Sequence, residues 1–353
     1  MTAGPKSPMI YAGVDTHADT HHVAIVDANG REVDDREFPA TTEGYRLILE
    51  WLSSCGTIVD VGIEGSASYG AGLTRYLHNA DISVSEVPHP SRRLRRASGK
   101  SDELDAYAAA RVVLSRHQLS TPKRGDGAIE AIRALRVAST SSTKAATASM
   151  NTLRALIVTA PDELREQLRG LSAATLLTRC VDLPTDAERL SDPAEATKMA
   201  LRSLATRSKL LRSEATQLKK NLAALVADAA PATSAVFGLG TDTAAALLIT
   251  IGDNPDRLRS EASFAHLCGV APVPASSGKT HRHRLHRGGD RRANQALHTA
   301  VIVRLRYHNG AREYANRRTT EGKSMPEIIR CQKRYLAREV FTALRTDYRD
   351  LTP

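Results

Sequence analysis

The chain has 353 residues, enough for two or three domains, and its 41% hydrophobic and 25% charged residues are an ordinary globular balance that excludes wholesale disorder. The formal net charge of +10 indicates a polyanionic partner such as nucleic acid. No apolar run is long enough to span a bilayer and the first eight residues are polar, so we expect no membrane partner and a cytoplasmic location. The four cysteines are scattered, which is typical of reduced thiols.

The first third of the chain alternates predicted strands with predicted helices. After an opening meander of three strands, each further strand follows a helix, and this order is typical of an α/β domain with a mixed sheet. We place this domain at residues 1–123. The expected strands cover 10–15, 22–27, 31–38, 58–64 and 82–87, and the expected helices cover 42–53, 68–79 and 101–117.

Four acidic residues of this domain form a candidate metal site. Asp15 and Glu64 each close an apolar strand, where a carboxylate has no structural purpose unless it is paired. Asp102 and Asp105 lie three apart after the capping residue Ser101, so they share one helix face, although a charge bias at the helix start also explains them. Carboxylate oxygens suit Mg²⁺ or Mn²⁺. The four acids therefore predict a two-metal site for displacement at phosphorus, in which Asp15 bridges the ions.

Two basic segments suit a phosphodiester partner. The first holds Arg92, Arg93, Arg95, Arg96 and Lys100 without an acid among them. The second begins with the hydroxyl pair Ser276 and Ser277 on a turn bracketed by Pro and Gly. A solvated basic loop explains the second segment, and a serine nucleophile explains it too if another group ionises the hydroxyl. Its cations are Lys279, Arg282, Arg284, Arg287, Arg291 and Arg292.

The middle and the end of the chain are predicted to be helical. Two long helices are expected over 128–160 and 193–230, within a helical domain at 124–230. Apolar or small residues recur in the second helix at 3,4 spacing, which predicts a coiled-coil arm for self-association as a dimer or tetramer. A mostly helical domain is expected at 231–353, where Gly238 and Gly240 suit either a phosphate-binding helix-hairpin-helix turn or only a tight turn. The seam residues are Leu201, Leu204, Ser208, Leu211, Ala215, Leu218, Leu222 and Leu225.

A zinc site in the second basic segment is not expected. Cys268, His281 and His286 have a finger-like spacing, but no second cysteine lies just upstream, and only His266 could replace it.

The sequence resembles the DEDD transposases of the insertion-sequence one-ten family and the related pilin-gene inverting recombinases. The resembling segments extend over nearly the whole chain in the same order. They are Gly13-Val14-Asp15-Thr16-His17, Gly62-Ile63-Glu64, residues 100–106, Gly238-Leu239-Gly240, residues 264–272, Ser277-Gly278-Lys279 and residues 287–294. One departure is Ser101, where threonine is frequent in the family, and a second is the run of histidines at 281, 283 and 286.

The resemblance implies an RNase H-like (RuvC-type) domain, a coiled-coil arm and a C-terminal transposase domain. It assigns Asp15, Glu64, Asp102 and Asp105 to the acidic tetrad, and it assigns the nucleophile to Ser277 because the family's serine directly precedes the glycine, with Ser276 as its neighbour. It further implies donor and target DNA as substrates, a structured non-coding guide RNA, and multimers in which acids and serine of different subunits meet. Base pairing rather than side chains would then choose the target sequence.

Three other functions are compatible with parts of the sequence. A Holliday-junction-resolvase-like nuclease would use the same acids with water as the nucleophile. A sugar-kinase or actin-like ATPase also opens with a Gly-Val-Asp strand and a hairpin, but it needs a second phosphate loop that the basic, helical later half does not offer. A DNA-binding protein without catalysis is the plainest alternative.

Overall fold

The computed structural model describes residues 7–88, 101–116, 119–278, 283–286 and 288–350. The chain divides into two compact units, the first made of Met1–Glu130 with Ile251–Ser263 and the second of Ala131–Thr250 with Phe264–Pro353. Each unit is described by itself. The predicted boundaries of three domains stay a prediction.

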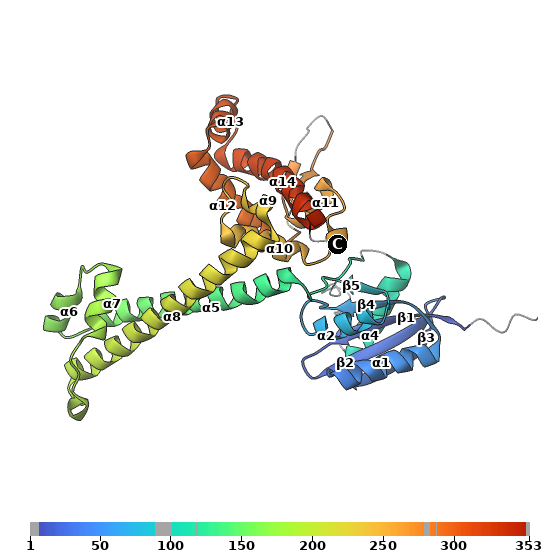
Figure 1. The fold of residues 1–353 in the computed structure, drawn as a ribbon, viewed down its shortest axis with the longest axis horizontal. Coiled ribbons are helices and arrows are strands. Elements are labelled where there is room, and N and C mark those ends of the chain that lie inside the picture. Colours follow the sequence, from blue (N-terminus) through green and yellow to red (C-terminus); the bar gives the residue numbers. More distant parts are fainter. Residues whose placement is uncertain (1–6, 89–100, 117–118, 279–282, 287, 351–353) are drawn as a thin grey trace, which may run out of the picture. The chain divides into compact units, whose positions relative to one another are not determined.

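The first unit is built on a five-stranded mixed sheet in the order β3-β2-β1-β4-β5 (Figure 1). The pairs β1–β2 and β2–β3 are antiparallel, whereas β1–β4 and β4–β5 are parallel. This arrangement confirms the predicted α/β domain with a mixed sheet. The strands are β1 (Met9–Thr16), β2 (Thr20–Asp27), β3 (Glu32–Pro39), β4 (Thr57–Glu64) and β5 (Val84–Val87).

Helices cover both faces of this sheet. The helices α1 (Thr42–Cys55) and α2 (Ala71–Asn79) pack on one face, and α4 (Asp102–Ser115) packs on the other. Because side chains alternate along a strand, Val14 and Ile63 enter the core under α1 and α2, while their neighbours turn toward α4. Asp15 and Glu64 are among these neighbours, so the alternation places both carboxylates on the α4 face.

The segment after α4 is held against a distant part of the same unit. Asn254 donates a hydrogen bond from Nδ2 to the Pro122 carbonyl at 2.8 Å, and Asp253 Oδ1 accepts one from the Ile129 amide at 2.8 Å. The short helix η2 (Pro255–Arg257) follows, and the Arg257 guanidinium bonds the Thr121 carbonyl. These contacts hold residues 121–129 within the first unit.

In the second unit, two long helices, α5 (Ala128–Val158) and α8 (Pro193–Ala229), lie side by side (Figure 1). The Ser208 hydroxyl of α8 donates to the Ala146 carbonyl of α5 at 3.3 Å, and the Ser142 hydroxyl lies 2.9 Å from Glu214 Oε2. The contact nearer the start of α5 is the one nearer the end of α8, so the two helices are antiparallel. Small or polar residues such as Ser142, Ala146 and Ser208 lie at the contact.

The seam predicted in α8 divides into two rows. One row is buried and the other is half-buried. The rest of the chain therefore covers only one side of the apolar stripe of α8. The buried row is Leu201, Ser208, Ala215 and Leu222, and the half-buried row is Leu204, Leu211, Leu218 and Leu225.

A small apolar cluster closes the end of this helix pair. Met150, Leu153 and Ile157 of α5 meet Leu201 of α8 and the two short α-helices of the segment between them. That segment also contains a short 3-10 helix. The sequence analysis did not predict these short helices. They are α6 (Asp162–Leu168), α7 (Ala173–Val181) and η1 (Ala187–Arg189).

The C-terminal helices assemble around α14 (Met325–Asp350). Asp347 of α14 is buried and accepts hydrogen bonds from the Ala232 and Thr233 amides at 2.8 and 2.9 Å, so its carboxylate caps α9 (Pro231–Ser234). Leu336, Val340 and Leu344 of α14 are buried. The remaining helices are α10 (Thr241–Ile251), α11 (Glu261–Leu267), α12 (Arg291–Tyr307) and α13 (Asn309–Thr320).

A two-stranded hairpin that the sequence analysis did not predict carries the serine pair. Its strands β6 (Pro272–Pro274) and β7 (His283–Leu285) are antiparallel, with Val273 opposite Arg284. None of the helices in the described ranges is long and apolar enough to cross a membrane.

Candidate active site

The site begins where two parallel strands end side by side. Val14 of β1 pairs with Ile63 of β4, so the next residues, Asp15 and Glu64, are neighbours at the same sheet edge. Their exposed fractions are only 8% and 6%. The Thr16 hydroxyl donates to the Glu64 carbonyl at 2.8 Å and fixes the two strand ends together. Because a buried carboxylate is costly unless it is compensated, this pair indicates a functional position.

Glycine brings α4 onto this edge. A Cβ on Gly13 would lie 2.1 Å from the Ala106 carbonyl oxygen and 2.2 Å from the Ala110 amide, so only a residue without a side chain fits there. Gly62 of β4 faces α4 in the same way, because a Cβ there would lie 3.0 Å from the Ala109 carbonyl oxygen. The backbone of α4 therefore touches the sheet directly, which brings the first turn of α4 to the strand ends.

The first turn of α4 supplies the other two acids. Ser101 caps the helix by accepting a hydrogen bond from the Leu104 amide at 3.2 Å, as predicted. Asp105 is buried, whereas Asp102 is partly exposed. The charges of both acids act on Asp15, which shows that the three carboxylates share one site.

Burial is the main reason that the pKa of Asp15 is raised above its ordinary value. The neighbouring carboxylates of Asp102 and Asp105 raise this pKa further, while His17 lowers it. The site thus concentrates negative charge in a place with little water. Such a charge excess is what a bound cation neutralises.

His17 is the member of the site that the sequence analysis missed as a candidate ligand. Its Nε2 atom lies 3.2 Å from Asp15 Oδ2 and 3.4 Å from Asp102 Oδ1. Both distances fall within ion-pair range, yet this buried nitrogen makes no hydrogen bond of acceptable geometry. The available signal was position, because His17 follows Asp15 by two residues just after the end of the strand.

Asp15, His17 and Asp102 offer ligand atoms that all lie within 4.8 Å of one another. Two carboxylates and an imidazole fit a divalent cation such as Mg²⁺ or Mn²⁺, and the nitrogen without a hydrogen bond agrees with this fit. Glu64 and Asp105 lie at the same edge and could complete the coordination.

The serine pair belongs to the second unit, whereas the acids belong to the first. Ser276 and Ser277 are exposed in the segment that follows β6, and Gly278 after them has a positive φ of 55°. An exposed hydroxyl on a hairpin is accessible to a large substrate. Lys279, Arg282 and Arg287 lie outside the described residues, as do Arg92, Arg93, Arg95, Arg96 and Lys100.

The remaining predicted cations are exposed near the hairpin. Arg284 lies on β7, and Arg291 and Arg292 open α12. Asp290, the single acid of the basic segment, caps α12 by accepting hydrogen bonds from the amides of Arg292 and Ala293 at 2.7 and 3.0 Å. This acid is therefore used structurally, and the segment keeps its basic character.

The Gly-Leu-Gly turn packs against α12. Gly238 has a φ of 91°, and a Cβ there would lie 2.9 Å from the Ala300 carbonyl oxygen. Arg304 of α12 donates to the Phe237 carbonyl at 2.7 Å and pairs with Glu339 through both terminal nitrogens. The close approach accounts for Gly238 as a packing residue, and the phosphate-binding interpretation of the turn stays a prediction.

Comparison with known proteins gives the class of the molecule. A family model described as a transposase, of the DEDD type, matches residues 12–160, which contain all four acids. A second, described as a transposase of the IS116/IS110/IS902 family, matches residues 232–316, which contain Ser277. A Streptomyces coelicolor protein named "Insertion element IS110 uncharacterized 43.6 kDa protein" is 24% identical over 383 residues, covering 95% of this chain and 94% of that protein.

The two family matches identify a DNA transposase, an enzyme that acts on DNA, and the mixed α/β sheet with a helical C-terminal part is consistent with this class. The two models match residues 12–160 and 232–316, in the order of the resemblance seen in the sequence. The chain belongs to the IS110 family of transposases.

Proposed function

We propose that this transposase cuts and rejoins DNA with a divalent cation, Mg²⁺ or Mn²⁺, held by Asp15, Glu64, Asp102 and Asp105, and with Ser277 as the nucleophile. The observation that carries the proposal is the convergence of buried carboxylates from two strand ends and one helix start. The strand order β3-β2-β1-β4-β5, with α4 on the carboxylate face, supports an RNase H-like (RuvC-type) fold for the first unit.

In the proposed reaction, Ser277 Oγ forms a new bond to the scissile phosphorus and the bond from phosphorus to one deoxyribose oxygen breaks. The serine proton passes to solvent, and the leaving oxygen takes a proton from solvent. A bound divalent cation would stabilise the charge on the attacking and leaving oxygens. Arg284, Arg291 and Arg292 would position the DNA backbone. Because the phosphoserine diester keeps the bond energy, a hydroxyl of a second DNA end can reverse the step and rejoin the strands.

The partners implied by the resemblance form part of this proposal. A structured non-coding RNA would base-pair with both donor and target DNA. Base pairing rather than side chains would then select the sequence. Self-association would use the arm, and the half-buried row Leu204, Leu211, Leu218 and Leu225 supports this. Acids and serine on separate units are compatible with a site shared between subunits.

The decisive experiment looks for a covalent protein–DNA adduct. Purified protein is incubated with labelled element-end DNA, the candidate RNA and Mg²⁺, and the products are separated under denaturing conditions. We expect an adduct with the wild type and with Ser276→Ala, and none with Ser277→Ala or Asp15→Asn. Cleavage without any adduct would instead assign the acids to a water-using nuclease of the Holliday-junction-resolvase type. Loss of the adduct in Ser276→Ala alone would move the nucleophile by one residue.

A further inference from the structure

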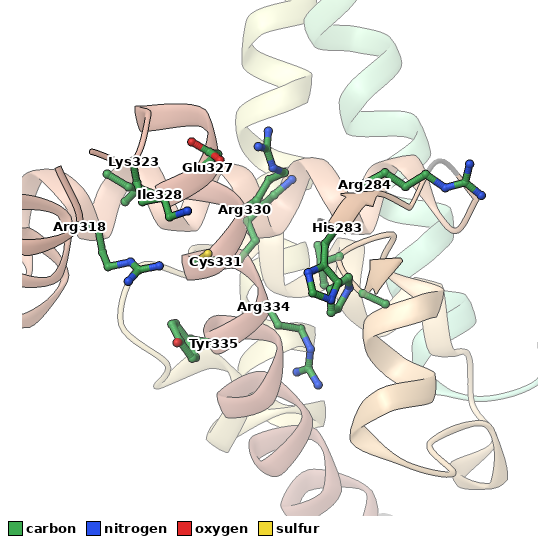
Figure 2. Close-up of a pocket in the computed structure, with 14 residues that line it drawn as sticks. His283, Arg284, Arg318, Lys323, Glu327, Ile328, Arg330, Cys331, Arg334 and Tyr335 are labelled. Carbon is green, nitrogen blue, oxygen red and sulfur yellow. The ribbon is translucent and has the colours of Figure 1, made fainter. Parts of the chain in front are cut away.

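A cationic groove lies beside the base of the hairpin, in the second unit. Its volume is about 800 Å³. Strand β7 lines one side of the groove, and the end of α13 with the residues that follow it lines the other side. The first turns of α14 lie between these two sides (Figure 2). The cations of this groove are Arg284, Arg318, Lys323, Arg330, Lys333 and Arg334.

The groove has a large excess of positive charge. Six cations face one lining carboxylate, Glu327. That carboxylate is already engaged, because its Oε2 accepts hydrogen bonds from the amide and the hydroxyl of Ser324 at 3.0 and 2.7 Å. In the described part of the chain, Arg284, Lys323 and Arg330 form no ion pair. The groove therefore suits an anion with several charges.

Lys333 is the strongest indication of a missing anion. Only 7% of it is exposed, and Nζ donates to the neutral side-chain oxygen of Asn294 at 3.0 Å. Within the described residues, no carboxylate lies at ion-pair distance from this ammonium group. Burial lowers the pKa of Lys333, with the charge of Arg330 acting in the same direction. A phosphate oxygen in the groove would supply the negative charge that the Lys333 ammonium group lacks among the described residues.

An aromatic ring stands among these cations. Tyr335 of α14 is 54% exposed. Its ring and that of Tyr314 are perpendicular, with centroids 5.6 Å apart and planes at 85°. This contact still leaves more than half of Tyr335 exposed. Figure 2 shows Tyr335 and Arg334 one after the other along α14. An exposed ring beside a row of cations is the combination that binds unpaired bases by stacking and their backbone by charge.

We propose that this groove binds a single strand of nucleic acid, with phosphates on Lys333, Arg330 and Arg284 and a base stacked on Tyr335. A duplex fits less well, because its bases are stacked on one another and offer no free face to a tyrosine. Half of the residues that line the groove lie on α14, and most of them lie beyond residue 316, where the second family match ends. The inference deepens the proposed function and rests on it for the supply of unpaired strands.

The groove also adjoins the predicted nucleophile. Pro272 and His283 line the groove, and both belong to the hairpin that carries Ser277. Ser277 follows the end of β6 by three residues, which reach at most about 10 Å. A strand held in the groove would therefore pass close to the serine.

The test measures binding without chemistry. Full-length protein carrying Ser277→Ala is titrated into fluorescein-labelled 12-nucleotide oligo(dT), oligo(U) and a 12-base-pair duplex, and fluorescence anisotropy is recorded. We expect tighter binding of the single strands than of the duplex. Adding Tyr335→Ala should weaken single-strand binding by about 5- to 100-fold, and Tyr335→Phe should restore it. The oligo(dT) and oligo(U) arms show whether the natural strand is DNA or RNA.

Matched controls separate the groove from general charge. Tyr307→Ala removes a tyrosine of similar exposure on α12 and should leave binding unchanged. Arg330→Ala should lower the slope of log affinity against log salt by about 0.7, the value for one lost phosphate contact with a single strand. Equal binding by the wild type and Tyr335→Ala, or a preference for duplex, would overturn the inference. Neither result affects the interpretation of the adduct experiment, because the binding assay involves no strand cleavage.

Discussion

The imidazole Nε2 of His17, which directly follows the last residue of β1, lies 3.2 Å from Oδ2 of Asp15. Asp102 reaches the same nitrogen from α4, at 3.4 Å. The relationship joins the opening strand of the sheet to the first turn of a helix that starts more than 80 residues later in the sequence. It also gives the acidic site a candidate nitrogen ligand.

We predict that His17 binds the divalent cation directly. In Mn²⁺-loaded protein, electron spin echo envelope modulation should detect the ¹⁴N nucleus of a bound imidazole, and His17→Gln should remove this signal. The substitution should also weaken Mn²⁺ affinity by about 10-fold or more, measured by calorimetry. His78→Gln, at the end of α2, serves as the control. A nitrogen signal that persists in His17→Gln would contradict the prediction.

Asp15 should cost stability in the metal-free protein and provide stability in the metal-bound one. A carboxyl whose pKa is raised by folding is penalised once it ionises, so the penalty is absent well below the ordinary value of 3.8 and complete above the raised value. Asp15→Asn should therefore raise the Tm at pH 7 without metal, and this gain should vanish near pH 3. Saturating Mg²⁺ at 100 times its Kd should stabilise the wild type by about 2.7 kcal/mol and the variant by much less. A wild type that melts above Asp15→Asn at pH 7 without metal would refute this account.

Gly13→Ala should separate α4 from the sheet. The new methyl group would meet the Ala106 carbonyl oxygen at 2.1 Å, and backbone atoms cannot move aside as a flexible side chain can. We expect a loss of about 3 kcal/mol or more in the free energy of unfolding, measured by urea denaturation, together with weaker metal binding. Gly240→Ala is the matched control, because nothing lies within 4 Å of a Cβ at that position. Equal stability of the two variants would show that α4 does not depend on this contact.

Asp347 should be a major support of the C-terminal helices. Its buried carboxylate accepts two amide hydrogen bonds from α9 and one from the Thr233 hydroxyl at 2.6 Å. Asp347→Ala leaves these donors without an acceptor and should destabilise the second unit by about 2–4 kcal/mol, as seen by thermal denaturation. Asp228→Ala, which removes an exposed acid near the end of α8, should change the Tm little. A shift of similar size in both variants would contradict this role.

The sequence was sufficient for the local elements and for much of the acidic site. Two short apolar runs predicted strands that end in Asp15 and Glu64, and the cap at Ser101 predicted the start of α4. The short elements escaped prediction for a physical reason. Helices α6 and α7 and the hairpin β6–β7 are too short to show a clear period, and they are stabilised by packing such as the Met150–Leu201 cluster rather than by their own pattern.

The sequence by itself determined which features the protein has. These are a basic chain, an α/β part with acids at strand ends, a long helix with apolar residues at 3,4 spacing, and a serine on a turn bracketed by Pro and Gly. Only the tertiary structure decided which groups meet. The contact of α4 with Gly13 brings Asp102 to His17, and the position of α14 beside the hairpin collects six cations and Tyr335 into one groove. Periodicity is a local property of the chain, whereas a metal site and a binding groove depend on distances between residues far apart in sequence, and only packing sets those distances.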